Sequence, residues 1–96
     1  MSNRTERDAI GELLLKEWKD FAEVLADRGE TWATTDPMTW PRDSTLWWLD
    51  HGIRRLLDAA AVVGLKLTRE ELERQHQERA EYRRLFPNGA PTLTNG

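Results

Sequence analysis

The spacing of apolar residues constrains the fold most, because they recur at intervals of three and four in two separate segments. The first stripe runs from Ile10 to Leu25, and the second runs from Leu46 to Val63. This interval places side chains on one face of an α-helix, whereas a half-buried strand would alternate apolar and polar residues. No segment shows that alternation. The sequence therefore predicts an all-α fold.

The ends of the first two helices are marked by residues with known terminal preferences. Thr5 opens a sequence close to a capping box, and Gly29 is suited to the left-handed conformation that stops a helix. For the second helix, either Asp43 or Ser44 can supply the N-terminal cap, and Gly64 follows its last apolar residue. We therefore expect helices that end just before these two glycines.

A third helix is predicted over 69–85, because Thr68 and Glu71 have the spacing of a capping box. Most of its residues are charged, so we expect it to stand partly away from the core. We predict a turn over 86–89 and an extended tail over 90–96.

The connection between the first two helices, Glu30–Asp43, carries both tryptophans and prolines. Pro37 and Pro41 prevent a long regular helix there. A flexible tether would be rich in Gly and Ser and would not place Trp32 and Trp40 in water. We therefore predict a three-helix domain with a long, ordered Trp- and Pro-containing loop.

Length and composition favour one domain that spans residues 1–96. The 14 Lys and Arg residues against 17 Asp and Glu give a net charge of −3, which disfavours nucleic acid as a partner. No apolar run approaches the roughly 20 residues that span a bilayer, so we expect no membrane association and a cytoplasmic location. The absence of cysteine excludes disulfides, thiolate metal sites and a cysteine nucleophile.

The sequence contains no motif that would make this chain an enzyme by itself. Its two histidines, His51 and His76, do not match the spacing of a zinc site, and no phosphate-binding glycine loop or nucleophile elbow is present. We therefore expect no catalytic residue, metal or cofactor in this chain.

Five tryptophans are a surplus for a domain of this size. One narrow three-helix core accommodates Trp18 and about one more ring, so the remaining indoles suggest an interface with another protein. The alternative is that the loop folds back and tucks Trp32 and Trp40 against the second helix as a satellite core.

Three groups of short motifs follow one another along the chain. They are Trp18, Ala22, Leu25-Ala26-Asp27-Arg28-Gly29 and Trp32; then Trp47-Trp48-Leu49-Asp50-His51, Gly64-Leu65 and Thr68-Arg69-Glu70-Glu71-Leu72; then Tyr82 with Phe86-Pro87-Asn88-Gly89-Ala90-Pro91. In this order, the chain resembles the helical N-terminal part of nitrile hydratase β subunits and the small activator proteins similar to them. The resemblance covers roughly residues 17 to 93.

Three positions depart from the family pattern. Gly52 stands where the family has a tryptophan, and Asn88 stands where it has a histidine. The family arginine that points at the oxidised metal-ligand cysteines of the partner has no counterpart that can be assigned, either to Arg28 or to Arg42.

The resemblance implies a partner rather than a self-sufficient site. In the family, a separate α subunit binds Co(III) or Fe(III), and this chain would pack on it beside a separate C-terminal β-like chain, as in thiocyanate hydrolase and the three-subunit toyocamycin nitrile hydratase. The expected function is that of a small, non-metal-binding subunit of a nitrile hydratase, a lyase that converts a nitrile and water to an amide. The candidate interface residues are Trp32, Trp40, Trp47, Trp48, His51 and Tyr82.

Two other functions are compatible with parts of the sequence. The first is an activator that escorts the α subunit during metal loading, because the stretch 87–91 resembles activators at least as well as β subunits. The second is a tri-helical DNA-binding module. The long connection over 30–43 and the acids among the arginines of the third helix argue against it.

Overall fold

The structure is a computed structural model that describes residues 2–88. Within that range the fold is all-α and has no strand, which confirms the predicted class. The predicted tail over 90–96 lies outside the described residues. The elements are α1 (Ser2–Asp27), the short 3-10 helix η1 (Pro37–Thr39), α2 (Thr45–Val62) and α3 (Arg69–Leu85).

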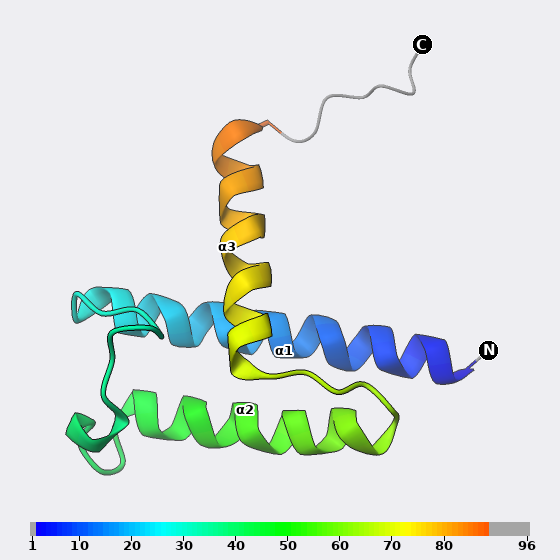
Figure 1. Cartoon of the computed structure of the whole chain (residues 1–96), viewed down its shortest axis with the longest axis horizontal. Helices are drawn as coiled ribbons and strands as arrows, with labels where there is room; N and C mark the ends of the chain where they lie inside the picture. The colour runs from blue at the N-terminus through cyan, green and yellow to red at the C-terminus, as the bar shows by residue number, and fades with distance from the viewer. Residues whose placement is uncertain (1, 89–96) are drawn as a thin grey trace.

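Helices α1 and α2 lie side by side and run in opposite directions, and α3 crosses α1 steeply (Figure 1). The C-terminal half of α3 projects away from the helix pair. Helix α1 therefore packs against both other helices, as expected for a helix that is apolar on more than one side.

Glycines end α1 and α2 as predicted. Gly29 has a φ of 76°, and the N–H of Glu30 donates to the carbonyl of Leu25 at 2.9 Å. This is a Schellman arrangement, which satisfies carbonyls that the helix leaves without intrahelical partners. Gly64, with a φ of 85°, closes α2 in the same way.

Hydroxyl caps begin α2 and α3. The Ser44 Oγ accepts from the backbone N–H of Trp47 at 3.3 Å, and the Thr68 Oγ1 accepts from that of Glu71 at 3.1 Å. Ser44, rather than Asp43, is therefore the cap of α2. Asp43 instead takes the left-handed conformation, with a φ of 62°, which aspartate tolerates better than most residues.

Helix α1 begins at Ser2, earlier than the predicted start at Thr5, which lies inside the helix. No Gly or Pro interrupts the preceding residues, so the helix continues to Ser2. The guanidinium of Arg7 donates to the carbonyl of Val63 at 2.8 Å. This contact joins the N-terminal half of α1 to the C-terminal end of α2, where a cation is favoured.

The core lies between α1 and α2, extends beneath the start of α3 and includes one ring from the connecting loop. Only Leu72 of α3 is fully buried among its described residues, which confirms that this helix stands partly away. The buried residues are Leu14, Leu15, Trp18, Phe21, Leu25, Trp40, Leu46, Ile53, Ala60 and Leu72.

Candidate partner interface

Three of the tryptophans surround Phe21 in what we call the inner aromatic cluster (Trp18, Phe21, Trp32 and Trp40). The ring centroid of Phe21 lies 5.1 Å from that of Trp18, 6.0 Å from that of Trp32 and 5.6 Å from that of Trp40. Trp18 and Trp32 meet edge to face at 5.5 Å. These are the tilted and T-shaped geometries that stabilise aromatic pairs.

Two indoles of this cluster bind α3 through their N–H groups. Trp18 Nε1 donates to Glu73 Oε1 at 2.9 Å, and Trp32 Nε1 donates to Glu70 Oε2 at 3.2 Å. The backbone N–H of Glu70 and then the Trp32 indole lower the pKa of the Glu70 carboxyl. The two carboxylates are three residues apart, so they share one face of α3 and hold it against the aromatic rings.

The third indole is bound within the loop. Trp40 Nε1 donates to Thr35 Oγ1 at 2.9 Å, and this hydroxyl donates in turn to Glu30 Oε1 at 2.8 Å. Arg28 pairs with Glu30 at 3.1 Å and, together with Thr35, lowers the pKa of the Glu30 carboxyl. The chain of polar contacts fixes the path of the loop around the ring.

Two of the six candidate interface residues therefore belong to the interior of this chain. Trp40 is only 9% exposed, and Trp32 is half-buried against the core. The loop folds back and adds a layer to the core, so the chain encloses more indole than two helices alone would hold. The loop folds back as in the satellite-core alternative, but the rings meet Trp18 and Phe21 of α1 rather than the second helix, as that alternative had it.

Three other candidates lie together on α2 in what we call the outer aromatic cluster (Trp47, Trp48 and His51). The Trp47 centroid lies 4.8 Å from that of Trp48 and 4.0 Å from that of His51. Trp48 is 58% exposed, whereas Trp47 and His51 are half-buried. Trp47 therefore packs on both neighbours, while the His51 ring lies 6.4 Å from that of Trp48, and the Trp48 ring remains at the surface.

The outer aromatic cluster borders an ion pair and an open position. Asp50 binds Arg69 at 2.9 Å, and this arginine also lies over the Trp32 ring at 5.9 Å. Asp50 therefore ties α2 to the start of α3. Gly52, the neighbour of His51, has open space where a side chain would be.

The sixth candidate, Tyr82, lies apart from the other five. Its ring meets that of Phe86 at a tilt, with centroids 5.0 Å apart, and both Tyr82 and Leu85 are exposed. The last turns of α3, which contain it, lie on the other side of α1 from α2 (Figure 1). Tyr82 and the outer aromatic cluster therefore do not form one surface patch.

Within the described range 2–88, no three His, Asp or Glu side chains gather as a set that could hold a metal ion. Nor does any described helix have the length and apolar character needed to cross a membrane.

Sequence reasoning did not identify three residues that organise these aromatic rings, namely Arg69, Glu70 and Glu73. The spacing of Glu70 and Glu73 places them on one face of the predicted third helix, which is the only signal available. The acceptors could be matched to their indoles only once the direction of α3 was known.

No protein-family model matches the chain, and neither a curated protein nor a solved structure shows significant similarity to it. The function proposed below therefore depends on the sequence motifs and on the surfaces just described.

Proposed function

We propose that this chain is a non-catalytic helical subunit that docks on a larger protein through the outer aromatic cluster. The partner we propose is the metal-bearing α subunit of a cytoplasmic, heteromeric nitrile hydratase, with a separate C-terminal β-like chain completing the enzyme. In that assembly the α subunit would hold Co(III) or Fe(III), and this chain would form part of the wall around the reacting nitrile.

The exposure of Trp48 is the observation that carries the docking proposal. Interface residues that contribute most to binding are enriched in tryptophan and lie where rings are held rigidly by their neighbours. Trp47 meets Trp48 edge to face at 4.8 Å and packs in turn on His51, while Gly52 leaves room for close approach of another surface. The ion pair between Asp50 and Arg69 fixes α2, which carries the ring, against the start of α3.

The choice of nitrile hydratase is supported by motifs rather than by geometry. The segment Trp47-Trp48-Leu49-Asp50-His51, followed by the Thr68 cap, is the part of the resemblance that coincides with the outer aromatic cluster. The lack of cysteine agrees with a subunit that leaves the metal to its partner.

Co-expression tests the subunit assignment. Candidate α and C-terminal β-like chains should be expressed with and without this chain, and conversion of a nitrile to its amide should be measured. We expect full activity only when all three chains are present. Full hydration in the absence of this chain would exclude the subunit role.

A surface variant tests the docking face. Trp48→Ala is expected to leave the fold intact and to weaken binding to the α subunit by about 30-fold or more, as truncation of a central interface tryptophan does. Met38→Ala is the matched control, because Met38 is 91% exposed but lies on η1. Equal affinities for the two variants, measured by calorimetry, would rule out this face.

Stoichiometry distinguishes the subunit from the activator. A subunit remains at a fixed ratio in the purified active enzyme, whereas an activator dissociates after the α subunit has received its metal. The stretch 87–91, which resembles activators at least as well as β subunits, is described only as far as Asn88.

A further inference from the structure

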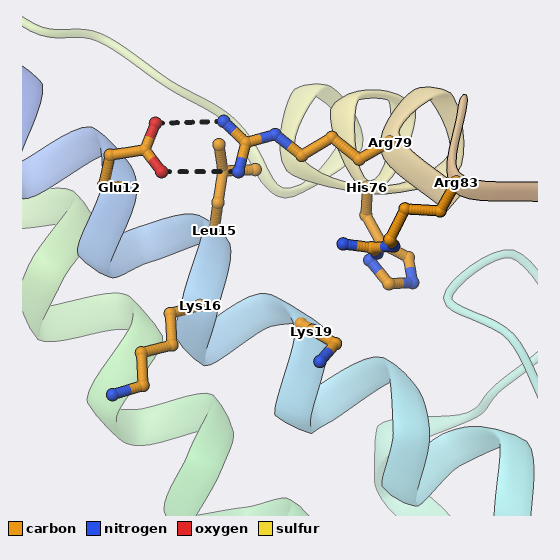
Figure 2. Close-up of a pocket in the computed structure, with 7 residues that line it drawn as sticks. All are labelled: Glu12, Leu15, Lys16, Lys19, His76, Arg79 and Arg83. Atoms are coloured by element: carbon orange, nitrogen blue, oxygen red, sulfur yellow. Dashed lines mark hydrogen bonds and ion pairs between the residues drawn. The ribbon is translucent and has the colours of Figure 1, made fainter. Parts of the chain in front are cut away.

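A crevice between α1 and α3 gathers basic side chains from both helices (Figure 2). Its volume is about 200 Å³, and Leu15 forms part of its wall. The charged and polar side chains that line it are Glu12, Lys16, Lys19, His76, Arg79 and Arg83.

Positive charge in this crevice exceeds negative charge, although the whole chain has a net charge of −3. Glu12 binds Arg79 through two hydrogen bonds of 2.9 and 3.3 Å, and these contacts lower the pKa of the Glu12 carboxyl. Lys19 pairs with Glu23 at 3.7 Å, with both side chains well exposed. Within residues 2–88, neither Lys16 nor Arg83 forms an ion pair.

We propose that this crevice binds a phosphate group, either as free phosphate or at the end of a small molecule. The site is independent of the proposed function, because no lining residue belongs to α2.

Charge and size favour phosphate over other anions. Of the four cations that line the crevice, Arg79 is paired with Glu12, and Lys16 extends away from His76 and Arg83 (Figure 2). The positive charge offered to a ligand therefore comes from Arg83 and from Lys19, whose pair with Glu23 is long and exposed, beside His76. Two cations at one place suit a dianion better than a single carboxylate. Arg83 offers the planar set of donors that matches phosphate oxygens. At about 200 Å³ the crevice is smaller than the roughly 300–1,000 Å³ pockets that hold drug-sized ligands, so it fits a phosphate group rather than a whole nucleotide.

Arg83 has a second role that must be separated from ligand binding. It lies beside Arg84 in the last turn of α3, where cations stabilise the C-terminal end of a helix. Arg84 pairs with Glu81 and does not line the crevice. The two neighbours therefore share the effect on the helix, and only Arg83 is placed to bind a ligand.

Inorganic phosphate provides the probe. Sodium phosphate should be titrated into the full-length, isotope-labelled chain at constant ionic strength, with sodium chloride as the balancing salt, and amide chemical shifts should be followed. We expect saturable shifts centred on Lys19 and His76. Arg83→Gln should weaken phosphate binding roughly tenfold or more, the usual effect of losing a hydrogen bond to a charged group, while Arg84→Gln should leave it unchanged.

Comparison with other anions and between the two variants tests where the ligand binds and what it is. Shifts that chloride reproduces, or that do not saturate, would overturn the proposal, as would equal effects of Arg83→Gln and Arg84→Gln. Acetate binding as tight as phosphate binding would overturn the preference for a dianion. Tighter binding of glycerol phosphate than of inorganic phosphate would support a phosphate ester as the ligand, and the reverse would support free phosphate.

Discussion

The indole N–H group decides how each buried tryptophan is used in this chain. A buried donor without an acceptor costs free energy, so a ring can enter the core only where an acceptor meets it. Trp18 donates to a carboxylate of α3, and Trp40 donates to a threonine hydroxyl in its own loop, both through part-buried hydrogen bonds. The half-buried Trp32 donates to α3 through an exposed hydrogen bond. No buried side-chain nitrogen or oxygen lacks a partner within the described residues. Polar residues that accept from the indole N–H groups therefore allow this chain to bury more tryptophan than its apolar residues alone would.

Gly52 leaves open space that a docked partner could use, whereas an alanine there would stabilise the isolated chain. It lies inside α2, and a Cβ added there would meet nothing within 4 Å. Gly52→Ala should therefore raise the free energy of unfolding by about 0.5–1 kcal/mol, because alanine restricts the unfolded chain and favours the helix. Chemical denaturation checks this value. Gly29→Ala, at a φ of 76°, is the control and should be destabilising. A less stable Gly52→Ala variant would contradict the open space at this site.

Helix α3 is held on the rest of the chain mainly by polar contacts. Leu72 is its only fully buried residue within the described range, and its polar contacts to the rest of the chain come from Arg69, Glu70, Glu73 and Arg79. A helix attached in this way should detach more readily than the α1 and α2 pair, because few apolar contacts oppose its release.

Acid should loosen α3 before it unfolds the other helices. Folding lowers the pKa of Glu12, mainly through Arg79, and that of Glu70, through its own N–H and Trp32. These contacts therefore stabilise α3 fully above about pH 4.3, the ordinary glutamate pKa, and the stabilisation is lost as the pH falls through the lower folded values. Amide hydrogen exchange, corrected for its intrinsic pH dependence, should show earlier loss of protection in α3 than in α2.

A variant isolates the contribution of Glu70 to this pH dependence. Glu70→Gln keeps an oxygen that accepts from Trp32 but cannot titrate in this range, so the exchange of α3 should depend less on pH. Glu78→Gln is the control, because Glu78 pairs only with Arg74 of the same helix. Equal protection of α3 in the wild-type chain at pH 3 and pH 7 would show that these carboxylates do not hold the helix.

Helix boundaries other than the start of α1 were predictable because they depend on neighbours in the sequence. Ser44 and Thr68 cap their helices with their own hydroxyls, and Gly29 and Gly64 end theirs by a local change of φ. The burial of Trp40 depends instead on a loop that returns to α1, and on acceptors such as Thr35 that become available only when it does. Local pattern therefore predicts the elements, whereas the division of tryptophans between core and surface requires the tertiary fold.

The grouping of the candidate interface residues in space was predictable only in part for the same reason. Trp47, Trp48 and His51 are close in sequence on one helix, so their grouping follows from the helical repeat. Tyr82 was grouped with them by motif order, but α3 crosses α1 and carries it to the other side. The direction of α3 depends on long-range contacts of Trp18 and Trp32, which no helical repeat encodes.

The three helices and the connecting loop share one continuous core, and Phe21 lies where they converge. Its ring is fully buried and meets three tryptophans, of which Trp18 comes from α1, while Trp32 and Trp40 come from the loop. Trp18 and Trp32 then bind α3. Loss of the Phe21 ring should therefore weaken the loop and α3 together with the α1 and α2 pair.

Phe21→Ala should lower the free energy of unfolding by about 3–5 kcal/mol, the usual cost of removing a buried phenyl ring. Domains of this size are stable by only roughly 5–15 kcal/mol, so much of the total would be lost. Urea denaturation followed by both tryptophan fluorescence and circular dichroism measures this change. Val62→Ala is the control, because Val62 is 86% exposed and should change stability by no more than about 0.5 kcal/mol. Since the core is continuous, the two signals should still change together; an early fluorescence change alone would show that the loop and its rings unfold independently of the helices.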